Sequence, residues 1–383
     1  MPSRRLGVIG GGQLAWMMAG AAQKLGIDLI VQTPNPCDPA ASLAAEVILA
    51  PVADAGATAR LAATCEVITF ENEFVDLEAL KQLENRGICF RPSLEALAPL
   101  LDKYHQRCYL QEIGLPVPHF AEFLGTEGIA SFPAVLKARR HGYDGQGTFI
   151  IDGPNALSAA LKSLGNTPVM LEEYVPFERE LAVIAARGIS GEVAIYPTVE
   201  TSQQDQVCHW AIAPTDIEPA IQQQAASIAR HLLTSLEYVG VLGIELFLTR
   251  DGKLSINEIA PRTHNSGHYT LDACEISQFE AQLRAVAGLP LGSTNLNCGG
   301  AVMVNLLGYE DSQQDYREKR DRLAAIPQAH LHWYGKSVSR PGRKLGHVTV
   351  LSNTLEATAR RRELLAAAKT IESIWYCKVS IQI

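Results

Sequence analysis

The sequence predicts an α/β protein of two or three domains, and three observations support this prediction. The 383 residues are 47% hydrophobic, which is ample material for more than one packed core. Strand-like and helix-like segments alternate through most of the chain, as they do in parallel sheets covered by helices. After about residue 290 the composition turns to short strands and loops, so we expect a small C-terminal domain that is mainly β.

The first domain shows successive βαβ segments. Parallel segments of this kind bind ligands at the carboxyl ends of their strands. A break with several prolines follows, and it places the start of the second domain near Pro99. The expected strands lie at 6–9, 28–32, 66–70 and 88–90, and the expected helices at 13–25 and 76–86.

The second domain alternates strands with three longer helices. We therefore expect domains at 1–98, 99–290 and 291–383. The strands are expected at 134–137, 148–151, 169–173, 180–186, 193–196, 241–249 and 253–259, and the helices at 155–164, 218–236 and 275–287.

Charge and composition exclude several classes of protein. The net charge is −8 and no basic run is interleaved with aromatic residues, which argues against a nucleic-acid partner. No run of about 18 apolar residues is present, so we expect no membrane span. The eight cysteines form no C-x-x-C pair, and the N-terminus leads directly into a strand without room for a signal peptide. Both features favour a cytoplasmic protein with reduced thiols.

The stretch "LGVIGGGQLAWMMAG" is a strand, a glycine turn and a helix. Gly10, Gly12 and Ala15 match the dinucleotide pattern G-x-G-x-x-G/A. A nicotinamide site also needs an acid at the end of the second strand, where this chain has Gln32 and Thr33. The sequence therefore disfavours a nicotinamide-dependent oxidoreductase. The backbone N–H groups of the turn remain suited to a phosphate, and a purely structural turn is the alternative.

A second glycine-rich segment, "FPAVLKARRHGYDGQGTFII", follows in the second domain. Its apolar residues lead to Lys137, then to a loop containing Gly142, Gly145 and Gly147, then to another strand. The pattern fits a hairpin whose tip closes over a polyphosphate, with the lysine supplying a charge near its base. It is not a P-loop, because G-x-x-x-x-G-K-[ST] is absent. An ordinary exposed hairpin is the alternative.

The stretch "VLGIELFLTRDGKLSINEIAPR" predicts a metal-binding hairpin. If the Asp-Gly dipeptide at 251–252 forms a two-residue turn, Arg250 pairs with Lys253 and Glu245 lies opposite Glu258. Their Cβ atoms would then be about 5 Å apart. Two like charges at that separation favour a divalent cation such as Mg²⁺, with Asn257 as a further oxygen ligand. A solvated face with two acids is the alternative, but the flanking residues are too apolar for it.

Two polar stretches flank this hairpin. In "LEEYVPFERELAV", backbone groups at 172–175 are placed to bind an adenine edge and Glu180 to bind ribose hydroxyls, against the alternative of ordinary charged residues near a strand end. In "APRTHNSGHYTLDA", Arg262 is suited to an oxyanion and His264 to moving a proton. The other polar residues of this second loop are Asn265, Ser266 and His268, and a polar loop with chance histidines is the alternative.

These motifs together resemble one enzyme family. "GGGQL", "GYDGQG", "EEYVPFERE", "IELFL", "NEIAPRTHNSGH" and "HLHWYGKSVSRPGRKLGH" occur in the order typical of ATP-grasp carboxylate–amine ligases. Within that superfamily the chain is most similar to the 5-(carboxyamino)imidazole ribonucleotide synthetase family of purine biosynthesis, over nearly its whole length. The resemblance implies an ATP-grasp domain between an N-terminal Rossmann-like, biotin-carboxylase-like domain and a small C-terminal domain.

The resemblance also implies a reaction and its participants. ATP phosphorylates bicarbonate to carboxyphosphate, and the amine of 5-aminoimidazole ribonucleotide is then carboxylated. Mg²⁺, or Mn²⁺, is the implied metal, and a cytoplasmic homodimer is the implied assembly. Another ATP-grasp ligase, such as a formate-dependent glycinamide ribonucleotide transformylase, is the alternative within the fold, and a non-catalytic nucleotide-binding regulator is the alternative outside catalysis.

Site residues follow from matching the family motifs. The residues implied for ATP are Lys103, Lys137, Gly142, Tyr143, Asp144, Gly145, Gln146, Gly147, Thr148, Glu172, Glu173, Tyr174, Val175, Glu180, Gln203, Asn257 and Glu258. Those implied for the ribonucleotide are Gly11, Gly12, Gln13, Glu71, Tyr143, Asp144, Ser266, Arg343 and Lys344. Arg262, His264 and Asn265 are implied to be catalytic, and Glu245 and Glu258 to bind the metal.

Four positions depart from the family pattern. Lys103 stands where arginine is frequent, which removes the guanidinium fork but keeps the charge. His141 and Ala15 stand at positions where glycine is usual. Gln203 replaces a histidine that relatives tend to place near ATP.

Overall fold

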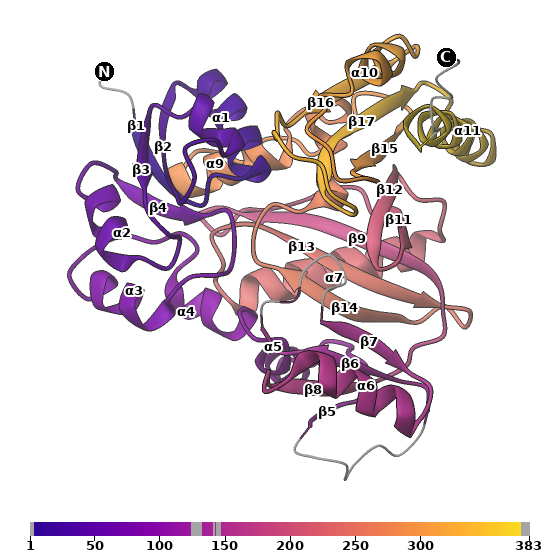
Figure 1. Ribbon diagram of the computed structural model, residues 1–383, viewed down its shortest axis with the longest axis horizontal. Helices are drawn as coiled ribbons and strands as arrows, with labels where there is room; N and C mark the ends of the chain where they lie inside the picture. The colour runs from indigo at the N-terminus through magenta and orange to yellow at the C-terminus, as the bar shows by residue number, and fades with distance from the viewer. Residues whose placement is uncertain (1–3, 124–131, 141, 143–146, 377–383) are drawn as a thin grey trace.

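The computed structural model describes residues 4–123, 132–140, 142 and 147–376. The strands of this part form three sheets, two of four strands and one of nine. In Figure 1 the N-terminal sheet lies at one end of the molecule, the second four-stranded sheet lies below, and the large sheet runs between them toward the C-terminal helix. The candidate site described below lies between the large sheet and the lower one.

The N-terminal sheet is parallel, with the order β3-β2-β1-β4. The expected strand at 88–90 is wrong, because only Phe90 pairs, through a single bridge to Ile68. Pro92 follows and has no N–H to continue a ladder. The elements are β1 (Arg4–Ile9), α1 (Gln13–Leu25), β2 (Ile27–Thr33), β3 (Glu46–Leu49), α2 (Ala55–Ala62), β4 (Val67–Phe70), α3 (Leu77–Glu84) and α4 (Leu94–Leu97).

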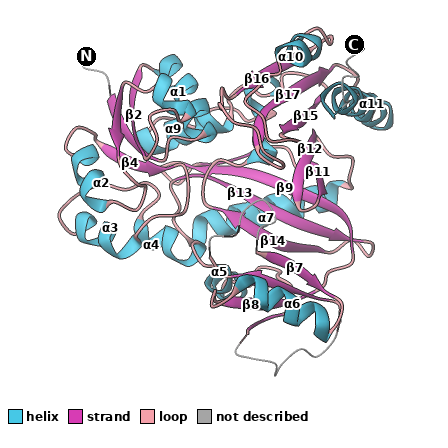
Figure 2. Ribbon diagram, in the orientation of Figure 1, coloured by secondary structure: helices cyan, strands magenta, loops and turns pink. Residues whose placement is uncertain are grey.

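The second four-stranded sheet is antiparallel, with the order β5-β8-β6-β7. Its apolar side chains pack against α6, which covers one face (Figure 2). The elements are α5 (Lys103–Glu112), β5 (Phe120–Glu122), β6 (Ala134–Ala138), β7 (Thr148–Ile151), α6 (Pro154–Leu164) and β8 (Val169–Glu173).

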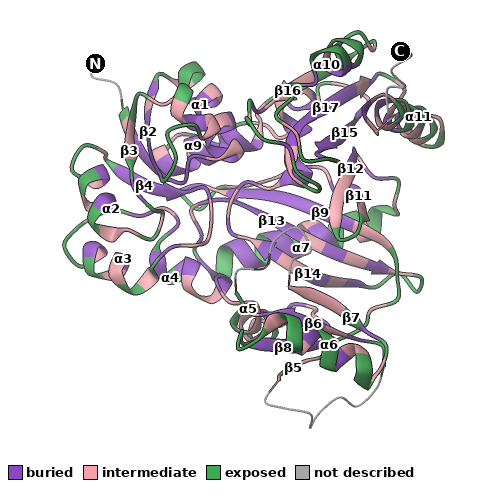
Figure 3. Cartoon of the chain, in the orientation of Figure 1, coloured by how far each residue is buried: buried purple, intermediate pink, exposed green. Residues whose placement is uncertain are grey.

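The large sheet has the order β14-β13-β9-β11-β12-β15-β17-β16, and β10 pairs with β9. Its central strand β9 is covered on both faces, and Figure 3 shows its long buried middle. Leu181 and Val183 pack with α7 on one face, while Ala182 and Ile184 pack with α9 on the other, as strand alternation requires. The elements are β9 (Phe177–Arg187), β10 (Val193–Ile195), β11 (Val199–Gln204), β12 (Val207–Ala213), α7 (Pro219–Ser235), β13 (Gly240–Thr249), β14 (Leu254–Ala260), α8 (Thr270–Ala273) and α9 (Gln278–Ala287).

The C-terminal region continues the same large sheet. It contributes β15 (Gly300–Leu307), α10 (Arg317–Ala324), β16 (Ala329–Trp333), β17 (Lys344–Ser352) and α11 (Ala357–Tyr376). The composition after residue 290 does not predict α11, a helix of 20 residues. Its buried residues Leu364, Ala368, Ile371 and Trp375 nevertheless follow a helical period and pack against β15 and β17.

Candidate active site

The β13–β14 hairpin confirms the predicted pairing of two glutamates but not the predicted turn. Glu245 pairs with Glu258, yet Leu246 pairs with Ile256, so the register shifts by one residue between them. The loop has three residues rather than two: the Thr249 N–H donates to the Lys253 carbonyl, and Gly252 takes a φ of 77°. A β-bulge at Asn257 restores the register.

The bulge brings polar side chains of the hairpin together with cations from other elements. The Asn257 amide donates to Glu245 Oε2 at 3.2 Å and accepts from Lys137 Nζ at 3.0 Å. Lys103, at the start of α5, lies 2.6 Å from Glu258 Oε2. The hairpin of the large sheet, the second sheet and α5 therefore meet at this point.

A buried ion-pair cluster supports Lys137. Its Nζ lies 2.6 Å from Glu172 on β8, and Arg107 of α5 binds the other Glu172 oxygen and the Asn257 carbonyl. Burial opposes ionisation of Glu172, but the two cations outweigh it and lower its pKa to about 2. Sequence reasoning missed Arg107, although its i,i+4 spacing from Lys103 places both on one face of α5.

Glu245 has the opposite electrostatic environment. Burial, followed by repulsion from Glu258 and Glu180, raises the pKa of Glu245 to about 7. Burial alone raises the pKa of Glu180 to about 7 as well. Glu258 differs because Lys103 and further cations outweigh its burial and lower its pKa. The cluster therefore holds more carboxylate than its cations neutralise, and its oxygen donors are suited to a hard divalent cation.

The predicted adenine-binding segment is divided by the structure. Glu172 and Glu173 belong to β8, and their backbones pair within the second sheet. The Glu172 side chain is occupied by Arg107 and Lys137. Tyr174 and Val175 follow the end of β8 and lie outside its ladders. Of the predicted segment, only 174–175 therefore lie outside the strand pairing.

The polar loop after β14 is held in place by two residues that are distant along the chain, Glu73 and Asn305. Arg262 makes a two-point ion pair with Glu73, at 2.7 and 3.2 Å. Asn265 exchanges two amide hydrogen bonds with the buried Asn305 of β15, at 2.9 and 2.6 Å. Sequence reasoning missed Glu73 and Asn305, because neither lies near the loop along the chain.

His264 lies beside the paired glutamates. Its Nε2 is 3.5 Å from Glu245 Oε1, and its Nδ1 lies 2.8 Å from the Ser266 hydroxyl. The Ser266 backbone N–H also donates to Nδ1, so in the neutral ring the proton resides on Nε2 and faces Glu245. A Cβ at Gly243 would lie 2.5 Å from His264 Cβ, so glycine is required there for the ring to pack on β13.

The opening glycine turn is occupied by a side chain of the protein. The Glu71 carboxylate faces the N-terminus of α1, where the backbone at Leu14 and Gly12 acts to lower its pKa. A Cβ added at Gly12 would lie 2.5 Å from Glu71 Oε1. The Glu71 carboxylate thus lies beside the N–H groups that the sequence predicts for a phosphate, and the phosphate there stays a prediction. Burial raises the pKa of Glu71 in this position.

Lys336, which sequence reasoning missed, links the first and last domains. Its Nζ lies 2.6 Å from Gln13 Oε1 and 2.7 Å from the carbonyl of Lys344. Arg343 donates to the Val338 carbonyl at 2.7 Å. Gln13, Lys336 and Lys344 therefore lie in one region, next to the glycine turn.

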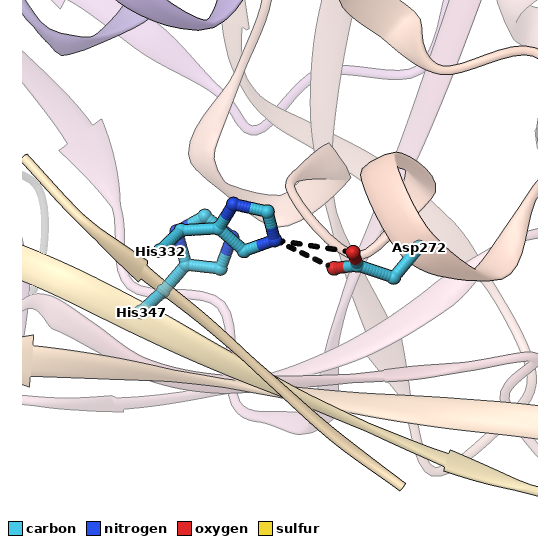
Figure 4. A group of neighbouring side chains, drawn as sticks. All are labelled: Asp272, His332 and His347. Atoms are coloured by element: carbon cyan, nitrogen blue, oxygen red, sulfur yellow. Dashed lines mark hydrogen bonds and ion pairs between the residues drawn. The ribbon is translucent and has the colours of Figure 1, made fainter. Parts of the chain in front are cut away.

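Two histidines pair across β16 and β17 in the C-terminal part of the large sheet. His332 and His347 face each other on β16 and β17 with stacked rings, and His332 Nε2 lies 2.9 Å from Asp272 (Figure 4). The Tyr334 hydroxyl oxygen lies 2.7 Å from His347 Nδ1. The two ring planes are 15° apart, and Asp272 and Tyr334 each contact one ring nitrogen of the pair.

Some predicted site residues lie away from the cluster around Lys137 and Glu245 or outside the described residues. Gln203 lies on β11, and among the described residues no hydrogen bond or ion pair joins its side chain to Lys137 or Glu245. Gly142, Gly147 and Thr148 flank the glycine-rich tip, with Gly147 at a φ of 80°. Tyr143, Asp144, Gly145, Gln146 and the divergent His141 lie outside the described residues.

Comparisons with known proteins agree along the whole chain. Family models match as a ribonucleotide synthetase preATP-grasp domain at 3–99, an ATP-grasp domain at 108–279 and a phosphoribosylaminoimidazole carboxylase C-terminal domain at 301–361.

No helix in the described part of the chain has both the length and the apolar character that a membrane crossing requires.

Individual relatives are similar over nearly their full length. An N5-carboxyaminoimidazole ribonucleotide synthase of Synechococcus elongatus is 56% identical, covering 98% of this chain and 96% of that protein. The N5-carboxyaminoimidazole ribonucleotide synthase of Synechocystis is 55% identical, covering 97% of this chain and 98% of that protein. The crystal structure of N5-carboxyaminoimidazole synthase from Aspergillus clavatus, with ADP and 5-aminoimidazole ribonucleotide, superposes with a TM-score of 0.87 at 32% identity, covering 96% of this chain and 99% of that one. The chain belongs to the N5-carboxyaminoimidazole ribonucleotide synthase family.

Proposed function

We propose that this chain uses ATP and bicarbonate to carboxylate the amine of 5-aminoimidazole ribonucleotide, giving N5-carboxyaminoimidazole ribonucleotide, ADP and phosphate in purine biosynthesis. The observation that carries the proposal is the meeting of Glu245, Asn257 and Glu258 with Lys103 and Lys137, in a chain of this family. Phosphoryl transfer depends mainly on such positioning and charge neutralisation.

ATP would lie between the large sheet and the second sheet. Lys103 and Lys137 would bind its phosphates, the backbone at 174–175 its adenine, and Glu180 its ribose. Glu172 supports Lys137 in this proposal rather than touching the nucleotide, because both its oxygens are already bound by cations. Lys103 would exchange part of its contact with Glu258 for phosphate oxygens.

Mg²⁺, or Mn²⁺ in its place, would be held by Glu245 and Glu258 with the Asn257 oxygen. The raised pKa of Glu245 supports this assignment, since a divalent cation would neutralise the repulsion that raises it. When bound, the metal would offset negative charge on the phosphates.

The reaction would proceed in two steps. A bicarbonate oxygen attacks the γ-phosphorus of ATP, ADP leaves, and carboxyphosphate forms. The amine nitrogen then bonds to the carboxyl carbon and loses one proton. The bond between that carbon and the phosphate oxygen breaks either during this attack or before it, in which case CO₂ is the species attacked. Arg262, His264 and Asn265 would position bicarbonate and the intermediate. Water must be excluded meanwhile, because carboxyphosphate hydrolyses readily.

The ribonucleotide would bind where the first and last domains meet the polar loop. Lys336 joins the predicted set because it contacts Gln13 and the Lys344 backbone. The other residues proposed to surround the ribonucleotide are Gly11, Gly12, Glu71, Ser266, Arg343 and Lys344.

The decisive experiment follows phosphate release and the incorporation of labelled bicarbonate together. Both should require ATP and bicarbonate, and both should rise when 5-aminoimidazole ribonucleotide is added. Phosphate release that ignores the ribonucleotide, with no label incorporated, would contradict the proposal. Formate with glycinamide ribonucleotide should give no turnover; turnover there would favour the transformylase instead.

We also propose a cytoplasmic homodimer, on the strength of the family resemblance. Light scattering coupled to size-exclusion chromatography should give a mass near twice 41.5 kDa. A monomer at micromolar concentration would contradict the assembly without affecting the proposed reaction.

A further inference from the structure

A cationic pocket, open to solvent, lies between α11 and the start of β9. It has a volume of about 540 Å³, and Arg179, Arg361, Arg362 and Lys369 line it together with Asp216 and Leu365. The α11 residues 361, 362, 365 and 369 recur at helical spacing, so one face of the helix forms this wall.

The pocket is separate from the proposed active site. Arg179 directly precedes Glu180 on β9, and successive side chains of a strand point to opposite faces of its sheet. Glu180 contributes to the electrostatics of Glu245, whereas Arg179 points toward Glu200 and Asp216. A ligand in the pocket would therefore lie across the sheet from the proposed nucleotide.

A buried carboxylate holds two of the arginines side by side. Glu200 is 7% exposed and binds Arg361 at 2.7 and 3.4 Å. Its Oε2 is also 3.6 Å from Arg179, whose Nη1 donates to the Asp216 carbonyl at 2.8 Å. One carboxylate thus fixes two guanidiniums at the pocket wall before any ligand arrives, which reduces the entropy lost on binding.

The charges of the pocket do not balance. Arg362 and Lys369 are exposed, and within the described residues neither forms a hydrogen bond or a close ion pair, although Arg362 acts on Glu356 through its charge. Four cations therefore line the pocket against the carboxylates of Asp216, Glu200 and Glu356, in a chain whose net charge is −8. Concentrating cations on an acidic protein favours a negatively charged ligand.

We propose that this pocket binds a small anion with two or more phosphate groups. Arginine forks match phosphate oxygens, and the excess of cations exceeds the charge of a single carboxylate ligand. Leu365 supplies an apolar wall next to the cations. An inorganic polyphosphate and a nucleoside polyphosphate share this chemistry.

The test compares three proteins by calorimetric titration with tripolyphosphate in metal-free, low-salt buffer. They are the wild type, R362Q/K369Q, and a control, K162Q, altered at an exposed lysine of α6. The active site is the same in all three, so differences report on the pocket. We expect the double variant to bind about tenfold more weakly, the control to match the wild type, and added salt to weaken binding.

Two outcomes would overturn the proposal: equal affinity in all three proteins, or no binding at millimolar tripolyphosphate. Carboxylation activity should be unchanged in the double variant, which also shows that it folds. A parallel titration with GTP distinguishes the ligands, since tighter binding of GTP than of tripolyphosphate, lost in the double variant, identifies a nucleotide. Failure of the carboxylation assay alone would leave the pocket's titration unaffected.

Discussion

Glu245 on β13 lies directly opposite Glu258 on β14, although the strand pairing toward the turn is shifted by one residue. The bulge at Asn257 reconciles the two registers. It also lets consecutive residues serve one site, because Asn257 reaches Glu245 while Glu258 reaches Lys103. The metal proposal depends on this arrangement.

Replacing Glu245 with glutamine should abolish most activity without unfolding the protein. The amide keeps the shape but lacks the charge that would hold Mg²⁺, so we expect turnover to fall by about 10²-fold or more. Mg²⁺ with ADP should raise the melting temperature of the wild type and raise that of E245Q less. Full activity with an unchanged Mg²⁺ dependence would contradict the assignment.

Metal-free stability should depend on pH through Glu245. Its pKa is raised from an ordinary 4.5 to about 7, so the folded protein binds this proton more tightly than the unfolded chain. The contribution of Glu245 to the free energy of unfolding should therefore fall as pH rises from about 4.5 to about 7, whereas the buried His268 and His347, whose pKa values are lowered, act in the opposite direction. The shift of Glu180 acts in the same window and direction, whereas the lowered pKa of Glu172 acts below pH 4.5.

Calorimetric melting between pH 4.5 and 7.5 in EDTA checks this dependence. Relative to E245Q, which lacks the Glu245 carboxyl, the wild type should lose stability as pH rises through this window. Identical slopes for the two proteins would mean that Glu245 ionises normally.

The glycine turn offers a matched pair of substitutions. In G12A the new Cβ would lie 2.5 Å from Glu71 Oε1, so we expect a loss of about 1–3 kcal/mol in the free energy of unfolding and a higher KM for the ribonucleotide. In G20A, within the same helix, the Cβ meets nothing within 4 Å, and stability should rise by about 0.5–1 kcal/mol. Denaturant titrations compare them, and an equal effect of both would contradict the steric argument.

The Asn265–Asn305 pair should position the polar loop. Replacing Asn305 with leucine leaves a buried Asn265 amide without its partner, so we expect a loss of about 1–3 kcal/mol in stability. If the pair positions the proposed catalytic loop, kcat should also fall, while the KM for ATP stays near that of the wild type. Unchanged kcat in a folded N305L protein would show that the pair only supports the fold.

Local patterns in the sequence were sufficient for most elements near the site. The helix at 13–25 and the strands at 148–151 and 169–173 have the predicted bounds, because their apolar periods and flanking glycines are local properties. The opposition of Glu245 and Glu258 was predicted correctly from a wrong turn, since the bulge offset the error. The strand at 88–90 failed because one bridge before Pro92 does not make a ladder.

What the sequence by itself determined is the fold class, the paired acids and the family, since these depend on period, spacing and motif order. Tertiary structure alone decided the partners: Arg107 for Glu172, Glu73 for Arg262, and Asn305 for Asn265. It also placed Glu71 in the glycine turn. These contacts join residues far apart in the chain. Because a buried polar group without a partner costs free energy, each group pairs with the residue that the packing of the elements places next to it.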